Sequence, residues 1–146
     1  MRTVEERLGL AMRLGLTEGR WEDALTEVRL ALIDDASSSS VSLALGVCYF
    51  HRRDFSETIS WLNQAASRAE RAMLAGTADA PWGPIYLFRA VAYAARRLPA
   101  AARADFVSLR DHDPAPVNWA SFEKLLLPDE LTRAKVAAEA AGMPRE

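Results

Sequence analysis

Apolar residues recur along most of this chain at intervals of three and four positions, the spacing that places them on one face of an α-helix. One such stripe lies between Trp21 and Ala31, and a second of the same character lies between Phe55 and Ala65. Each consists of an aromatic residue, a small residue, a branched apolar residue and an alanine: Trp21, Ala24, Val28 and Ala31, then Phe55, Thr58, Leu62 and Ala65. No segment shows sustained apolar–polar alternation with β-branched residues, so we predict helices and no sheet.

A second pattern precedes the middle stripe, where Leu45-Gly46 is followed three positions later by Tyr49. The last third of the chain carries a fuller version of it, with Tyr86, Ala90, Tyr93, Ala102, Phe106 and Pro114. Together these residues resemble the tetratricopeptide repeat, in which Trp-xx-Leu-Gly-xx-Tyr is followed by Ala-xxx-Phe and Pro, and the interval from Trp21 to Phe55 matches the period of that repeat. The small residues let two antiparallel helices approach closely, and the pairs must stack to bury their apolar faces.

The resemblance implies an all-α protein, a right-handed α-solenoid of three helix-turn-helix repeats followed by C-terminal capping helices. We expect one domain over residues 1–146, with repeats at about 5–38, 39–72 and 83–116, an inserted loop at 73–82, and capping helices at 117–142. The pattern departs from the family at Met12 and Gly15 in the first repeat and at Pro99 in the third. Asp54 with Glu57 resembles a capping box, and Pro128 marks the start of the last helix.

The family places its ligand on the concave face, which the first helix of each repeat lines. By register, the resemblance implies a peptide-binding groove formed by Arg13, Leu16, Leu43, Val47, Phe50, His51, Leu87, Val91 and Ala94. Its centre is apolar, and the matching positions supply no lysine or asparagine, so we do not expect a clamp for an acidic C-terminal tail. Apolar residues at this spacing also form ordinary cores. The same patch could therefore be filled by the chain's own tail or by a second copy.

Composition narrows the classes of partner. The net charge of −2, with acids and bases mixed along the chain, gives no basic face for nucleic acid and no polybasic segment for a membrane. No apolar run approaches the roughly 20 residues that span a bilayer. Glu5 and Glu6 precede any apolar stretch, unlike in a secretory signal, so we expect a cytoplasmic protein. The scarcity of lysine beside arginine and the many alanines indicate a GC-rich, bacterial genome.

The residues that could carry chemistry are few and scattered. His51 and His112 lie far apart without further ligands at metal spacing, and Cys48 is the only cysteine. Cys48 falls within a predicted buried helix and lacks an adjacent base, so we expect a core thiol and not a nucleophile. No glycine-rich phosphate loop is present. We expect no metal, no cofactor and no enzymatic activity.

The functional expectation is therefore a protein-binding module, an adaptor or small chaperone that holds an apolar segment of another polypeptide. Three repeats, the small size and the apolar groove are similar to those of bacterial type III secretion chaperones, which protect hydrophobic translocators. The alternative is a structural protein whose groove patch mediates homo-oligomerisation, for example as a homodimer, or is filled by its own C-terminal helix.

Overall fold

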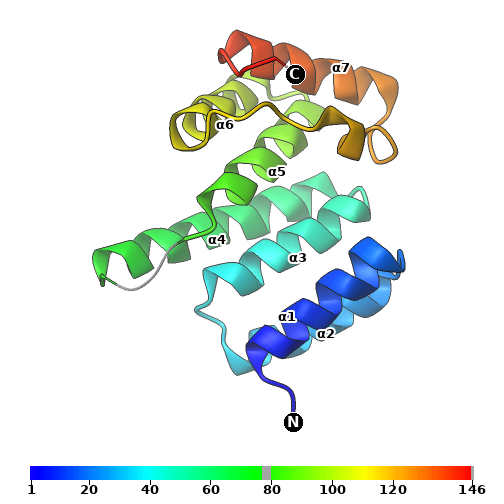
Figure 1. Ribbon diagram of the computed structural model, residues 1–146, viewed down its shortest axis with the longest axis vertical. Coiled ribbons are helices and arrows are strands. Elements are labelled where there is room, and N and C mark those ends of the chain that lie inside the picture. The colour runs from blue at the N-terminus through cyan, green and yellow to red at the C-terminus, as the bar shows by residue number, and fades with distance from the viewer. Residues whose placement is uncertain (77–79, 146) are drawn as a thin grey trace. The chain divides into compact units, whose positions relative to one another are not determined.

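The chain is helical throughout the part described by the computed structural model, which covers residues 1–76 and 80–145, and no strand occurs in that part (Figure 1). This confirms the all-α prediction. The α-helices are α1 (Val4–Met12), α2 (Trp21–Asp34), α3 (Ser39–His51), α4 (Phe55–Leu74), α5 (Trp82–Ala95), α6 (Pro99–His112) and α7 (Pro128–Ala140). A π-helical turn, η1 (Arg13–Thr17), prolongs α1, and a 3-10 turn, η2 (Trp119–Phe122), precedes α7.

The helices form two compact units, Met1–Pro81 and Trp82–Glu146. In unit 1, α1 packs against α2, α2 against α3, and α3 against α4. In unit 2, α5 packs against α6, and α7 packs against both. The boundary between the units falls at the end of the insertion expected at 73–82. Residues 77–79 of that expected loop lie outside the described residues, and α4 extends into its first two positions.

The same kind of turn, with one residue of positive φ, joins the two helices of each pair: α1–α2, α3–α4 and α5–α6. Gly19, Arg53 and Arg97 each adopt the left-handed backbone conformation, with φ of 68°, 62° and 62°. In the second and third turns, the amide of the following residue donates a hydrogen bond back to the carbonyl of Tyr49 (3.0 Å) or Tyr93 (2.9 Å). This is the hydrogen-bonding pattern of a helix that ends on a left-handed residue. The interval from Gly19 to Arg53 equals that from Trp21 to Phe55, so the first two turns follow the period of the sequence pattern.

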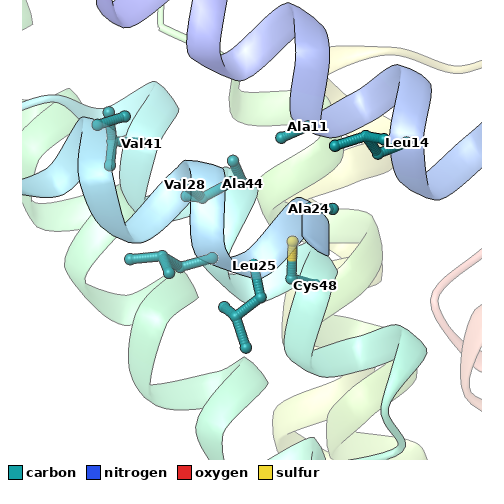
Figure 2. Close-up of a cluster of buried hydrophobic side chains, with 10 residues drawn as sticks. Ala11, Leu14, Ala24, Leu25, Val28, Val41, Ala44 and Cys48 are labelled. Atoms are coloured by element: carbon teal, nitrogen blue, oxygen red, sulfur yellow. The ribbon is translucent and has the colours of Figure 1, made fainter. Parts of the chain in front are cut away.

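The core of unit 1 is built where α1, α2 and α3 meet (Figure 2). It is made mostly of alanine and branched aliphatic side chains: Ala11, Leu14, Ala24, Leu25, Val28, Ala31, Val41, Ala44, Leu45 and Cys48. The spacing of three and four expected for α2 is confirmed, because Ala24, Val28 and Ala31 are all fully buried.

Close approach of α3 and α4 depends on Gly46. A Cβ atom added there would lie 2.7 Å from Leu62 Cδ2 and 2.9 Å from Leu62 Cγ. Leu62 is itself fully buried and cannot move aside freely. At the start of α4, Asp54 accepts a hydrogen bond from the Glu57 amide (3.2 Å), which is one half of the predicted capping box. The Asp54 amide instead donates to the Tyr49 carbonyl (3.0 Å).

In unit 2, the segment after α6 packs back onto the α5–α6 pair. Phe122 meets Phe88 edge to face with ring centroids 5.9 Å apart, and the Trp119 ring centroid lies 6.1 Å from that of Phe106. Val117 and Leu126 are buried along the same segment. The tail therefore completes the core of unit 2.

An ion pair joins α5 to α6 near the middle of unit 2. Arg89 Nε donates to Asp105 Oδ2 (2.8 Å) and Arg89 Nη2 donates to Asp105 Oδ1 (2.7 Å), a two-pronged geometry that only a guanidinium offers. Both side chains are largely buried. Burial raises the pKa of the Asp105 carboxyl, and the bonds from Arg89 oppose that shift.

Gly46→Ala should lower the free energy of unfolding by about 1–3 kcal/mol, because the new methyl group overpacks a core that is already filled by Leu62. Gly9→Ala is the matched control. An added Cβ there has no neighbour within 4 Å, so alanine in helix α1 should raise stability by about 0.5–1 kcal/mol. Urea unfolding measures both, and equal effects would contradict the packing argument.

Asp105→Asn should lower the free energy of unfolding by about 2–4 kcal/mol, because it leaves the Arg89 guanidinium largely buried without its carboxylate. Replacing both partners, Arg89→Met with Asp105→Leu, should recover most of that loss, since no charge then stays buried. Thermal and urea unfolding of the single and double variants test this. If the double variant is less stable than Asp105→Asn, the attraction between the two charged groups contributes more free energy than their burial costs.

Candidate functional site

The predicted groove residues of unit 1 divide into exposed and buried sets. Leu16 on η1 is 69% exposed, and Arg13 on the same turn is exposed. Leu43 on α3 is partly exposed, whereas Val47 is buried and Phe50 is fully buried. Phe50 packs edge to face against Phe55 of α4, with ring centroids 5.5 Å apart, and so contributes to the α3–α4 core.

His51, at the C-terminal end of α3, lies flat against the Trp21 ring. The ring centroids are 3.7 Å apart and the planes differ by 12°. The Phe50 ring meets its edge, with centroids 6.1 Å apart. Burial lowers the pKa of His51 to about 4, because the protonated ring loses hydration there. Neutral His51 therefore acts as a packed aromatic side chain.

The remaining predicted groove residues belong to α5 in unit 2. Leu87 is partly exposed, and Val91 is fully buried. Ala94 is 2% exposed because α7 covers the C-terminal end of α5. The predicted groove residues thus belong to two units, and within each unit some of them are buried and others are exposed.

Arg133 of α7 fixes this contact between α7 and α5. Its Nε donates to the carbonyl oxygen of Ala94 (3.0 Å) and its Nη2 to that of Ala95 (3.1 Å). Both carbonyls lie in the last turn of α5, where a cation also complements the helix dipole. Asp129, one turn earlier on α7, accepts from Arg133 Nη1 (2.9 Å), and this bond lowers the pKa of the Asp129 carboxyl.

A groove of about 510 Å³ opens in unit 2 beside this contact, between α7 and the start of α6. Alanines form much of its lining, with Val136 of α7, which is 61% exposed. The complete set, which we call the α6–α7 groove, is Ala94, Arg97, Pro99, Ala100, Arg103, Thr132, Arg133, Val136, Ala137 and Ala140. Its volume is within the range of about 300–1,000 Å³ seen for binding pockets.

The groove continues along the outer side of α6. A neighbouring hollow of about 370 Å³ shares Ala100 and Arg103 with it and adds Ala104 and Val107. Positions 100, 104 and 107 are spaced by four and three, so they form one stripe on α6. From position 100 to 107 the stripe runs about 10.5 Å at about 1.5 Å per residue.

The geometry of the described residues gives little support for a reactive thiol or a metal site. Cys48 is buried, and burial raises the pKa of its thiol to about 12, so the reactive thiolate is suppressed. Within residues 1–76 and 80–145, no three histidine, cysteine, aspartate or glutamate side chains gather as a metal site would require. The described helices include none with the length and apolar content to cross a membrane.

Sequence reasoning included Ala94 but missed the rest of the α6–α7 groove. It assigned the ligand face to the first helix of each repeat, whereas this groove uses the second helix of the last pair and the tail. Alanines at 100, 104, 137 and 140 were the available signal. Small residues on two helices allow a third to approach closely, but the sequence does not show that α6 and α7 are neighbours.

Comparisons with protein-family models, curated proteins and solved structures found no match to this chain. The tetratricopeptide resemblance therefore stays a prediction.

Acidification should destabilise the protein through His51. Its pKa of about 4 in the folded chain lies below the unfolded value of about 6.5, so the unfolded state binds more protons between these pH values and stability falls as the pH is lowered. The slope due to this one group is at most about 1.4 kcal/mol per pH unit. His51→Phe keeps a ring on Trp21 and should remove that slope. Urea unfolding across this window measures it, and an unchanged slope in the variant would contradict the assignment.

Proposed function

We propose that this protein is a protein–protein interaction module and that it docks a helical segment of a partner polypeptide in the α6–α7 groove. The observation that carries the proposal is the groove itself, a hollow of about 510 Å³ with an exposed apolar side chain, Val136, on its wall. Concave, mostly apolar surface is a frequent location of binding sites in proteins. The proposal keeps the function expected from the sequence and moves the docking surface to unit 2.

A helix is the best-fitting occupant because the lining side chains are small. Ala100, Ala104, Ala137 and Ala140 project only a methyl group, so the backbone of an incoming helix can approach closely between α6 and α7. The stripe of about 10.5 Å along α6 accommodates roughly two helical turns. A segment with apolar residues at i, i+3 or i+4, and i+7 would present a continuous ridge to it.

We also propose that the three helix pairs, α1–α2, α3–α4 and α5–α6, are tetratricopeptide-like repeats. The left-handed residue at each pair's turn supports this. Gly19 and Arg53 are one sequence period apart, and Arg97 follows after a longer interval because the insertion intervenes. An adaptor or small chaperone of bacterial type would have this organisation.

A second candidate follows from Arg133. Because α7 binds the end of α5 through this side chain, it packs against Ala94, one residue of the predicted groove. This favours the alternative in which the concave patch is filled by the chain's own C-terminal helix. In that case, the α6–α7 groove is the docking surface that stays available on unit 2.

The test is to select peptides that bind the full chain from a displayed library of amphipathic helices, each about five turns long. The peptides carry leucine and alanine on one face, and Glu, Gln or Lys varies at the flanking positions. Peptides that bind the wild type should lose at least about tenfold in affinity for Val136→Glu, because a carboxylate then replaces a Val side chain whose burial contributes about 1.5–3 kcal/mol.

Ile33→Glu is the matched control, since Ile33 is an exposed branched side chain on α2 in unit 1. It introduces the same charge away from the groove and should leave binding unchanged. Thermal unfolding of both variants checks that the fold is intact. If no peptide discriminates wild type from Val136→Glu, the groove is not a polypeptide-binding site.

A further inference from the structure

The α6–α7 groove has a one-sided distribution of charge. Three arginines line it: Arg97 in the α5–α6 turn, Arg103 on α6 and Arg133 on α7. The residues described along its walls include no aspartate or glutamate. The whole chain, by contrast, has a net charge of −2, so this local excess of cations is not a consequence of composition.

Two of the three cations are not neutralised by the protein. Arg133 is engaged by Asp129 and by the carbonyls of Ala94 and Ala95. Arg97 and Arg103 are exposed, and neither forms an ion pair within the part of the chain that the structure describes. Their guanidinium groups are therefore available to an anionic ligand.

Arg97 differs from its counterpart in unit 1, Arg53, in the surroundings of its side chain. Arg97 has a φ of 62°, a conformation that disfavours residues with a Cβ, and Gly19 holds the same place in the first turn. In unit 1, Arg53 shares the conformation, and its guanidinium lies 5.2 Å from the centre of the Phe55 ring. The position corresponding to Phe55 is Pro99, which offers no ring, and Arg97 instead lines the groove.

From these observations we infer that the α6–α7 groove is selective for an acidic amphipathic helix, one whose apolar ridge is flanked by glutamate or aspartate. This inference rests on the proposed function and specifies the chemistry of the partner. The ridge packs on the alanines and Val136, while flanking carboxylates pair with Arg97 and Arg103. The flanking carboxylates on such a helix recur one to two turns apart, about 5–11 Å, and each can form a charge-assisted pair with a guanidinium group.

The same peptide library tests the inference through its flanking positions. On the wild type, Glu should be enriched over Gln, and Lys should be depleted. A matched Glu peptide should bind roughly 2- to 25-fold more tightly than its Gln counterpart, since each of the two exposed ion pairs contributes between about 1.4-fold and fivefold. Fluorescence anisotropy at low and high salt measures this advantage, which should shrink as ions screen the pairs.

Arg97→Gln with Arg103→Gln should abolish the preference for Glu while the Gln peptide still binds. Arg71→Gln is the control, because Arg71 is an exposed arginine of α4 in unit 1, and its loss should leave the preference intact. If Glu and Gln peptides bind the wild type equally, or Lys peptides bind best, the inference is overturned while docking in the groove stands. If peptides bind regardless of sequence and equally to Val136→Glu, the proposed function fails as well.

Discussion

Close approach of paired helices at small side chains is the constraint on which the rest of this structure depends. Where α3 meets α4, the absence of a Cβ at Gly46 lets Leu62 fill the space that a side chain would occupy. In the core of unit 1, alanines from α1, α2 and α3 permit the same closeness. Short helices do not persist alone in water, so their stability comes from the faces that this packing buries.

The same constraint has a different consequence in unit 2. Only some of the alanines on α6 and α7 are buried. Those at positions 100, 104 and 140 lie on the surface. Alanine side chains do not fill the space between two helices, so a hollow is left beside the contact. The α6–α7 groove is therefore lined in part by alanines that the contact between α6 and α7 leaves exposed.

Arginine serves three distinct roles in this small chain, and burial separates them. Arg89 forms a largely buried pair with Asp105 that joins α5 to α6. Arg133 satisfies the last carbonyls of α5 and so orients α7. Arg97 and Arg103 stay exposed beside the groove that Arg133 helps to form. The first two roles hold the unit together, and the third leaves two cations on the surface.

The sequence by itself determined that the chain is helical, where α4 and α7 begin, and which stripe of α2 is buried. These properties depend on neighbours within a turn or two, such as the spacing of Ala24, Val28 and Ala31 or the Asp54 cap, and local interactions are readable from local patterns. The turns at Gly19 and Arg53 recur at the same interval as the sequence pattern.

Tertiary structure alone decided which apolar residues remain accessible. Val91 and Val136 are both valines on helical stripes, yet the first is fully buried and the second is 61% exposed. Nothing within a few residues of either distinguishes them, because exposure depends on which distant helix packs alongside. The bonds from Arg133 to the end of α5 span almost forty positions, and only the folded chain brings such groups together to form the groove.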